Sequence, residues 1–399
     1  MIKTVKQSEY VGVISIPPSK SDSQRAILCS ALAKGKSELL NVGKSADELA
    51  MLETVKQFED ASSMKSIFVG ESGLGVRLLT SVVSVLDQEI EIVGHGSLNQ
   101  RDLSFFDRYF PKMGVKVESN NGKLPLKIQG PIQGGTYEVD GSESSQYISG
   151  LLMALPMAKT DSKLVVKDLK SVAYVDMTLK TLESFGIEIE ANGSVYSIKG
   201  NQKYNSCRYQ IDGDWSSASC WIVASALGKN ISIDGLSLSS LQADKQLLTA
   251  LIHAGCQVLR SDDGISIDGT NRLPLNFDAS DCPDLFPALA IYAALTEGEN
   301  RIKGIHRLGN KESDRALALK TELGKLGIDV LLDLETDCMI ISGQNEVVGG
   351  QVDAWNDHRI AMCMGVLGMF SSSEMEITGA ESVAKSYPDF WLDLEKLGQ

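Results

Sequence analysis

The sequence predicts an α/β (α+β) protein of two domains, on the basis of its length, an internal repeat and a recurring helix end. At 399 residues, the chain exceeds what a single hydrophobic core usually serves. One unit recurs six times, and each copy has a short apolar strand, a polar turn and an apolar helix. A unit of this kind is a mixed α and β supersecondary motif. The copies begin at Ile14, Ile67, Tyr137, Tyr209, Leu275 and Gly350.

A second signature lies between these copies, a helix that closes in glycine before alternating strands. The segments FPKMGVKVE, LESFGIEIE, LIHAGCQVL and LGKLGIDVL place this glycine at positions 114, 186, 255 and 327. Glycine there suits a left-handed helix cap. Short strands follow and end at a further glycine, as in LKIQG, YSIKG, ISIDG and IISG. Each unit is therefore expected to hold two helices and four short strands.

The polar turn before the first helix differs from copy to copy. It reads KSDSQR, ESGLGVR, SESSQ, DWSSAS, SDCPD and NDHR along the chain. Different charged residues at one fixed structural position indicate a shared site. A helix amino terminus favours anions, so several such ends facing one cleft would bind a polyanion. The alternative is a solenoid that only creates a surface, but solenoid units usually run about 20 to 50 residues and these are longer.

The composition excludes several classes of protein. The formal charge of −14 argues against a nucleic-acid partner, which needs a basic surface. The amino terminus MIKTVKQSEY has no apolar region, and apolar stretches such as Ile360 to Phe370 are shorter than a membrane span. We therefore expect a cytoplasmic protein without a membrane partner.

The cysteine pattern and the missing motifs narrow the chemistry. The seven cysteines are scattered and form no C-x-x-C pair, which fits reduced thiols rather than disulfides or a zinc site. The chain has no P-loop, no G-x-G-x-x-G after a strand and no metal-ligand spacing. No metal and no cofactor are expected.

The first copy carries Lys20, Ser21 and Arg25 in its turn and first helical turn. Ser21 and Arg25 are spaced i and i+4, so they share one helix face. A cation at a helix amino terminus opposes the helix dipole, which favours a bound anion as the reason for its position. The alternative is an exposed basic helix start without function.

A second charged group is Lys311, Glu312 and Arg315, at the start of a helix with an apolar stripe of alanine and leucine. One interpretation is a solvated face with local ion pairs. The other is an acid/base carboxylate between phosphate-binding cations. Asp284, in the turn CPDLFP, is a further buried acid, although as a helix N-cap it would need no function.

The turn NDHR supplies the last cluster ahead of an apolar helix. His358 is interpreted as a structural histidine, because a lone histidine more often satisfies the fold than catalyses. Arg359 is interpreted as functional, since its planar fork suits carboxylate or phosphate. Lys385 in VAKSYPDFW and Arg101 in LNQRDL complete the cationic set.

Taken together, these segments resemble 5-enolpyruvylshikimate-3-phosphate synthases over essentially the whole chain. The motifs PPSKSDSQRA, DGSESSQYISGLLMA, SVAYVDMTL, DGDWSSAS, NKESDR, WNDHRIAM and AKSYPDFW occur in the family's order. The resemblance implies a two-lobed, inside-out α/β barrel with six βαβαββ-type units, three in each lobe. One lobe would hold residues 1–18 plus 213–399 and the other 19–212, with the active site in the cleft between them. A monomer is implied as well.

The resemblance also implies the substrates, shikimate-3-phosphate and phosphoenolpyruvate, and the residues that bind them. Asp284 would accept the proton of the attacking hydroxyl, Glu312 would protonate the methylene carbon, and Lys20 and Lys385 would stabilise charge. The implied shikimate-3-phosphate contacts are Lys20, Ser21, Arg25, Ser144, Ser145, Gln146, Ser171, Tyr174, Asp284 and Lys311. The implied phosphoenolpyruvate contacts are Lys20, Gly73, Arg101, Gln146, Arg315, Arg359 and Lys385.

Two segments depart from the family's pattern. Where the family usually has Asn-Ala-Gly-Thr before an arginine, this chain reads Glu71, Ser72, Gly73 and Leu74, so the resemblance predicts neither phosphoenolpyruvate affinity nor the response to glyphosate. Arg307 stands where an asparagine is usual and is left unassigned.

Two other functions compete with the implied transferase. One is the sister enolpyruvyl transferase that acts on UDP-N-acetylglucosamine, which usually carries a reactive cysteine in the loop that here reads GHGSLNQR. The other is a non-catalytic anion-binding homologue that kept the fold.

Overall fold

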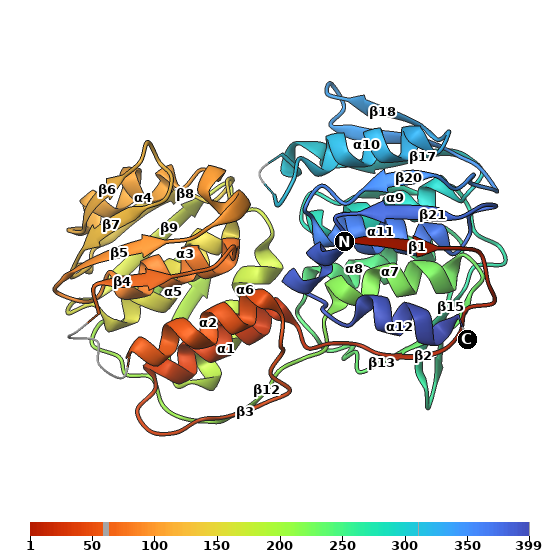
Figure 1. Ribbon diagram of the computed structural model, residues 1–399. Coiled ribbons are helices and arrows are strands. Elements are labelled where there is room, and N and C mark those ends of the chain that lie inside the picture. Colours follow the sequence, from red (N-terminus) through yellow and green to blue (C-terminus); the bar gives the residue numbers. More distant parts are fainter. Residues whose placement is uncertain (59–63, 310, 399) are drawn as a thin grey trace. The chain divides into compact units, whose positions relative to one another are not determined.

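The structure is a computed structural model that describes residues 1–58, 64–309 and 311–398. Asn310, the first residue of the NKESDR motif, lies outside the described residues. The chain divides into two compact units. The first unit holds Met1–Ser19 with Asp212–Gln399, and the second unit holds Lys20–Ile211 (Figure 1).

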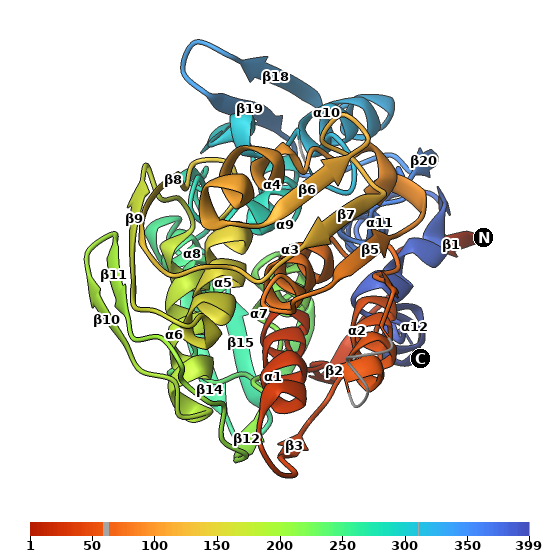
Figure 2. The ribbon, with the colours of Figure 1, turned by 90° about the vertical axis from the view of Figure 1, so that its left-hand side faces the viewer.

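In the second unit, two four-stranded sheets share one topology: strand, helix, parallel strand, helix and a closing hairpin. The first is built from β4 (Ser66–Phe68), α3 (Gly73–Val83), β5 (Glu89–Val93), α4 (Ser104–Tyr109), β6 (Lys116–Ser119) and β7 (Leu126–Gln129). The second is built from β8 (Thr136–Asp140), α5 (Ser145–Ala154), β9 (Ser162–Lys167), α6 (Val172–Ser184), β10 (Ile189–Asn192) and β11 (Val195–Ile198). Strand β10 lies at the edge of the second sheet and forms a hairpin with β11, which is visible in Figure 2.

The third part of this unit is formed by segments far apart in the sequence. Strand β3 (Glu38–Leu40) pairs in parallel with β12 (Arg208–Gln210), and helices α1 (Lys20–Leu32) and α2 (Ala46–Lys56) accompany them. The helix that follows β12, α7 (Trp215–Ala226), belongs to the first unit. The chain therefore passes between units inside the fourth copy of the repeat, and likewise inside the first copy between β2 (Val11–Ser15) and α1.

The first unit has two four-stranded sheets of the same plan and one sheet of three strands, one fewer than the sequence predicts for each copy. One sheet has β2 beside β13 (Asn230–Asp234), β15 (Gly264–Asp268) and β14 (Gln257–Ser261), with helices α7 (Trp215–Ala226) and α8 (Gln246–His253). The next has β16 (Asn276–Asp278), α9 (Phe286–Ala294), β17 (Gly298–Lys303), α10 (Arg315–Lys325), β18 (Asp329–Asp333) and β19 (Cys338–Gly343). The last has β20 (Gln351–Asp353), α11 (His358–Gly368), β21 (Met375–Thr378) and β1 (Ile2–Val5), and α12 (Phe390–Leu397) ends the chain.

The first helix of each copy forms the core of its unit. Helices α3, α9 and α11 are buried along their whole length, and α7 is buried except at Ser216. In Figure 1, α7, α9 and α11 lie inside their unit with strands around them. Their apolar residues explain this position, because a helix that is apolar all round must be covered on every side. The predicted inside-out arrangement of helices within sheets is confirmed.

In four copies of the repeat, the polar turn supplies the residue that caps the helix after it. Ser72, Ser144, Asp214 and Asp357 each accept a hydrogen bond from a backbone N–H in the first turn of the helix that follows. A capping side chain satisfies a donor that the helix itself leaves unpaired. These capping hydrogen bonds fix the conformation of the turns without any ligand.

The two recurring glycines have different physical causes. Gly114, Gly186, Gly255 and Gly327 adopt φ of 80°, 77°, 82° and 81°, which confirms the predicted left-handed caps. The strand-ending glycines instead lie against a carbonyl at the end of the preceding inner helix. A Cβ on Gly269, for example, would meet the Ala226 carbonyl oxygen at 1.8 Å, and one on Gly343 would meet that of Thr296 at 1.9 Å. Close backbone approach, rather than φ, requires glycine there.

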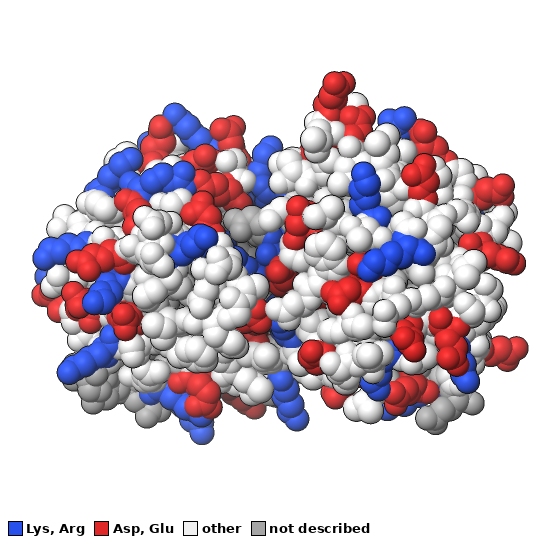
Figure 3. All heavy atoms as spheres, turned by 45° about the horizontal axis from the view of Figure 1, so that its top comes forward, with Lys and Arg blue, Asp and Glu red and all other residues white. Residues whose placement is uncertain are grey.

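The surface is mixed in charge. On the faces that Figure 3 shows, lysine and arginine side chains alternate with aspartate and glutamate across each unit. Within the described residues, every helix is too short or too polar to span a membrane.

Candidate active site

In the first unit, three cations converge on the carboxylate of Asp284. Arg315 donates from Nη1 to Oδ1 at 2.7 Å, Lys311 donates from Nζ to Oδ1 at 3.2 Å, and Arg359 donates from Nη2 to Oδ2 at 3.1 Å. Asp284 is the middle residue of a short 3₁₀ helix, η6 (Pro283–Leu285), that leads into α9. It occupies neither N-cap position, so the interpretation of Asp284 as a capping residue is wrong.

These cations determine the ionisation of Asp284. Burial would raise the pKa of its carboxyl group, but Arg359, Lys311 and Arg315 outweigh that effect and hold the pKa well below its ordinary value. Burial in turn lowers the pKa of the Lys311 ammonium, and Asp284 opposes the shift. The group is therefore a carboxylate held ionised by its neighbours.

Arg315 connects this cluster to α11. Its Nε donates to Asp357 Oδ2 at 2.8 Å, and its Nη2 donates to Glu312 Oε2 at 2.7 Å and to Asp357 Oδ1 at 3.3 Å. Because the Arg315 side chain is buried, the interpretation of this residue as part of a solvated face is wrong. Glu312 and Lys311 remain partly exposed, so they can meet a ligand as well as their neighbours.

The predicted residues of the NDHR turn lie at the start of α11. The Arg359 backbone N–H donates to the capping carboxylate of Asp357 at 2.9 Å, while its side chain reaches Asp284. His358 is buried within the helix start. Lys385, at the end of the 3₁₀ helix η8 (Ala380–Lys385), donates to the Asn356 carbonyl at 2.7 Å. Asp284, Lys311, Glu312, Arg315 and Arg359 thus form one hydrogen-bonded group, and Lys385 contacts the adjoining turn.

In the second unit, the start of α1 is largely buried. Lys20 pairs with Asp47 at 3.0 Å, and these side chains are 14% and 10% exposed. Arg25 is buried completely and donates to Thr178 Oγ1 at 2.8 Å and to the Ser21 carbonyl at 2.6 Å. The alternative of an exposed basic helix start is therefore wrong.

Arg25 also links α1 to the helices beside it. Its Nη2 donates to Ser149 Oγ on α5 and to the Tyr174 carbonyl on α6, both at 3.3 Å. Burial lowers the pKa of the Arg25 guanidinium to about 10, with Asp22 as the main opposing influence. Arg25 is therefore a buried cation that neutral groups from three helices hold in place.

A second group in this unit surrounds the start of α3. A Cβ on Gly73 would lie 2.2 Å from Nη1 of Arg101, so only glycine lets that guanidinium approach the helix start. Arg77 donates to the Gly73 carbonyl at 2.9 Å and to Gln146 Oε1 at 3.0 Å. The structure thus brings the predicted Gly73, Arg101 and Gln146 together, with Arg77 between them.

The predicted serines lie at helix starts. Ser144 caps α5 by accepting from the Gln146 N–H at 3.3 Å, and Ser145 is the buried first residue of that helix. Ser171 precedes α6 with a left-handed φ of 54°, and Tyr174 offers its carbonyl to Arg25. Ser144 and Ser145 therefore lie at the helix start that holds Gln146, and Ser171 and Tyr174 lie at the start of the helix to which Arg25 donates.

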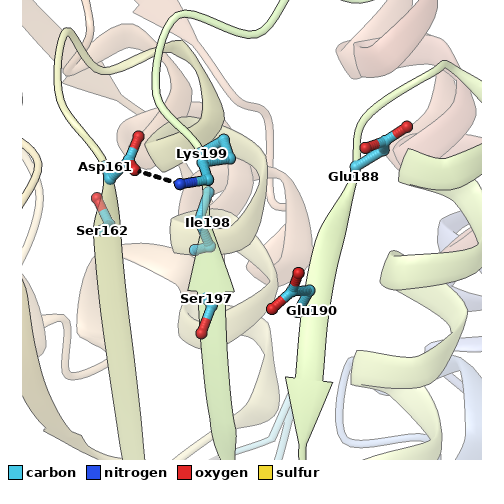
Figure 4. Close-up of a pocket in the computed structure, with 7 residues that line it drawn as sticks. All are labelled: Asp161, Ser162, Glu188, Glu190, Ser197, Ile198 and Lys199. Atoms are coloured by element: carbon cyan, nitrogen blue, oxygen red, sulfur yellow. Dashed lines mark hydrogen bonds and ion pairs between the residues drawn. The ribbon is translucent and has the colours of Figure 1, made fainter.

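A further pocket in the second unit contains none of the predicted residues. It lies over strands β9, β11 and β10, where Asp161 pairs with Lys199 at 2.8 Å (Figure 4). Its lining residues are Asp161, Ser162, Glu188, Glu190, Ser197, Ile198 and Lys199. With three carboxylates and one lysine it has no preference for an anion, so it stands apart from the candidate site.

Sequence reasoning left several buried ionisable residues without an assignment, among them Asp357, Arg77 and Asp244. Asp357 accepts a hydrogen bond from Arg315, and Arg77 donates one to the Gln146 side chain. Asp244 accepts a hydrogen bond from the Ser216 hydroxyl near the start of α7. Asp357 could have been found from its place directly before the helix, where an aspartate is an N-cap. The contacts of Arg77 and Asp244 carry no sequence signal, because their partners are 69 and 28 residues away.

The fold and these clusters define a two-unit α/β protein in which buried and partly buried cations are grouped at helix starts. A family model described as EPSP synthase (3-phosphoshikimate 1-carboxyvinyltransferase) matches residues 5–394. The chain belongs to this family, and the family predicted from its motifs is confirmed.

Relatives and solved structures agree with this assignment. The 3-phosphoshikimate 1-carboxyvinyltransferase of Clostridium novyi (strain NT) is 38% identical, covering 98% of this chain and 96% of the relative. That of Clostridium acetobutylicum is also 38% identical, covering 97% and 95%. A 2.37 Å structure of EPSP synthase from Acinetobacter baumannii is 25% identical with a TM-score of 0.82, covering 100% of this chain and 98% of that one. The predicted two-lobed α/β fold is confirmed.

Proposed function

We propose that this chain is a 3-phosphoshikimate 1-carboxyvinyltransferase. It transfers the enolpyruvyl group of phosphoenolpyruvate to the 5-hydroxyl of shikimate-3-phosphate and releases phosphate, a step of the shikimate pathway that leads to chorismate and the aromatic amino acids. Membership of the family and the names of its relatives support this activity. The enzyme is proposed to act as a monomer in the cytoplasm.

The observation that carries the proposal is the group around Asp284. Lysine and arginine side chains from two separate segments, Lys311 with Arg315 and Arg359, donate to one carboxylate. A second carboxylate, Glu312, accepts a hydrogen bond from Arg315. Both substrates are polyanions, so the reaction needs cations held close together. It also needs one group to accept a proton and another to donate one.

The residues have distinct roles in the proposed mechanism. Asp284 accepts the proton of the 5-hydroxyl as its oxygen bonds to C2 of phosphoenolpyruvate, and Glu312 delivers a proton to C3. Glu312, now a carboxylate, then takes a proton back from C3 of the tetrahedral adduct as phosphate leaves, which restores the double bond. Lys20 and Lys385 stabilise the charge that develops. Positioning by the cations supplies about 7 to 11 kcal/mol of the barrier reduction.

Substrate binding would also change Asp284 itself. Without ligand, Arg359, Lys311 and Arg315 hold its pKa well below the ordinary value, which makes the carboxylate a weak base. Anionic groups that share these cations weaken their hold on Asp284, so its basicity rises when both substrates are bound. In this mechanism the acceptor becomes effective only in the loaded enzyme.

The substrate contacts are proposed as the family resemblance implies them. Shikimate-3-phosphate uses Ser21, Arg25, Ser144, Ser145, Ser171, Tyr174, Asp284 and Lys311. Phosphoenolpyruvate uses Gly73, Arg101, Arg315, Arg359 and Lys385, and Lys20 and Gln146 are shared. Each set includes residues from both compact units.

One assay tests the function against its two alternatives. Release of phosphate from phosphoenolpyruvate is measured with shikimate-3-phosphate, with UDP-N-acetylglucosamine and with no acceptor. We expect release only with shikimate-3-phosphate. Release only with the nucleotide sugar would select the sister transferase, and no release with either acceptor would select a binding protein. Sedimentation of the purified chain tests the monomer.

A further inference from the structure

Two loops of the second unit are joined along their length, the one after β4 and the one after β5. The Val69 N–H donates to the Val93 carbonyl at 2.9 Å, and the His95 N–H donates to the Gly70 carbonyl at 3.0 Å. The next residue of the first loop continues this contact through its side chain. Glu71 Oε1 accepts from the Ser97 backbone N–H at 2.7 Å.

The Glu71 carboxylate lies at the start of a short helix in the second loop, next to a glycine. Ser97 belongs to the 3₁₀ helix η2 (Gly96–Gln100), whose N-cap residue, His95, makes no capping side-chain bond. Gly96 has a φ of 61°, and a Cβ there would lie 2.5 Å from Glu71 Oε1. The backbone angle favours glycine at position 96, and a Cβ there would displace the Glu71 carboxylate from its present position.

Glu71 accepts a hydrogen bond at one end of η2, and Arg101 lies at the other end. Arg101 is the C-cap of η2 and donates its backbone N–H to the Leu98 carbonyl at 3.1 Å. Its side chain is buried and lies against Gly73, two residues after Glu71. Glu71 thus connects the two chain segments whose residues Gly73 and Arg101 meet.

We propose that Glu71 is a positioning residue for phosphoenolpyruvate, because its hydrogen bond to Ser97 holds η2 so that the Arg101 guanidinium lies beside Gly73. Glu71 itself touches no substrate in this account. The inference rests on the proposed function, since it assigns a device to the phosphoenolpyruvate pocket of that reaction. It also gives a physical use to the one pocket segment where this sequence departs from its family's pattern.

The test compares three variants of the full-length chain in the phosphate-release assay. Glu71→Ala removes the acceptor, so the KM for phosphoenolpyruvate rises roughly 10-fold while the KM for shikimate-3-phosphate stays within about twofold. Glu71→Gln keeps an acceptor oxygen and recovers most of the affinity. The control is Asp161→Ala, which removes a carboxylate in the same unit that accepts from the Gly200 N–H at 3.0 Å; it leaves both KM values unchanged.

A double-mutant cycle shows whether Glu71 acts through Arg101. Once Arg101→Ala has removed the guanidinium, adding Glu71→Ala raises the phosphoenolpyruvate KM little further. If Glu71→Ala expresses poorly, Glu71→Asp serves instead, since its shorter side chain draws back from Ser97.

Each other outcome overturns the inference. An unchanged phosphoenolpyruvate KM in Glu71→Ala, an equal rise for both substrates, or full additivity with Arg101→Ala would show that Glu71 only supports the fold. A Glu71→Gln variant as impaired as Glu71→Ala would exclude the hydrogen bond to Ser97 as the cause. Failure of the wild-type chain to release phosphate would instead refute the proposed function, so the two failures are distinguishable.

Discussion

Arg315 and Asp357 form a buried ion pair, with Nε to Oδ2 at 2.8 Å and with side chains that are 1% and 0% exposed. Asp357 also caps α11, and Arg315 is the first residue of α10. The pair therefore fixes the starts of two helices against each other, and it leaves the other guanidinium nitrogens of Arg315 directed at Asp284 and Glu312. The buried guanidinium of Arg315 therefore positions both proposed catalytic carboxylates, Asp284 and Glu312.

Asp357→Asn tests this arrangement. The variant keeps an N-cap but leaves Arg315 with less compensating charge, so we expect a loss of unfolding free energy at the lower end of about 3–5 kcal/mol. The matched control is Asp314→Asn, which changes the N-cap of α10 at an exposed position and should cost less than about 0.5 kcal/mol. Denaturant unfolding measures both, and equal costs would contradict the role of the buried pair.

Glu312→Gln tests proton donation. Glutamine keeps an acceptor for Arg315 but has no proton to deliver, so kcat should fall roughly 10²- to 10⁴-fold with little change in either KM. Steady-state kinetics with both substrates varied measures this. Unchanged turnover would remove Glu312 from the mechanism.

Asp244 should make stability depend on pH near neutrality. Burial raises the pKa of its carboxyl group to about 7, nearby Asp284 adds to the shift and Arg359 opposes it. A raised pKa means that the folded protein favours the protonated acid. This contribution is complete below the unfolded pKa of about 3.9 and is lost as pH rises through about 7.

The variant Asp244→Asn cannot ionise and should avoid that loss. Relative to wild type, its unfolding free energy should increase between about pH 4 and 8, by on the order of 3 kcal/mol. Urea unfolding across this range measures the difference, with Asp268→Asn as an exposed control. A difference that stays constant with pH would refute the assignment.

Gly269→Ala tests the close backbone approach at the strand ends. Its Cβ would meet the Ala226 carbonyl oxygen at 1.8 Å, so we expect a loss of about 1–3 kcal/mol. Gly324→Ala, in α10 with no atom within 4 Å of the new Cβ, should instead gain about 0.5–1 kcal/mol. Thermal unfolding of both variants checks the contrast, and a neutral Gly269→Ala would disprove it.

Local features of the fold could be predicted from the sequence, because they depend on neighbouring residues. The left-handed glycines and the strand–turn–helix repeats are determined within a few residues of chain. The partners of β2 and β12 could not be predicted. Each is separated from its own copy's helix by a passage between units, and it pairs with a strand more than 160 residues away.

The site was predictable as a set of residue types but not as a set of contacts. Basic residues at helix starts pointed to Arg25, Lys311 and Arg359. Whether such a residue is exposed or buried depends on packing between helices, and so the interpretation of Arg315 as a solvated residue failed. The same dependence on packing concealed Arg77, whose partner Gln146 belongs to the next copy of the repeat.

The reaction itself is the most direct test of the account. Phosphorus NMR of the chain with shikimate-3-phosphate and phosphoenolpyruvate should show the phosphoenolpyruvate signal replaced, one for one, by inorganic phosphate. The phosphate ester of shikimate-3-phosphate should persist in a new enol ether product. An unchanged phosphoenolpyruvate signal, or phosphate formed without that product, would contradict the transfer that the Asp284 group is proposed to catalyse.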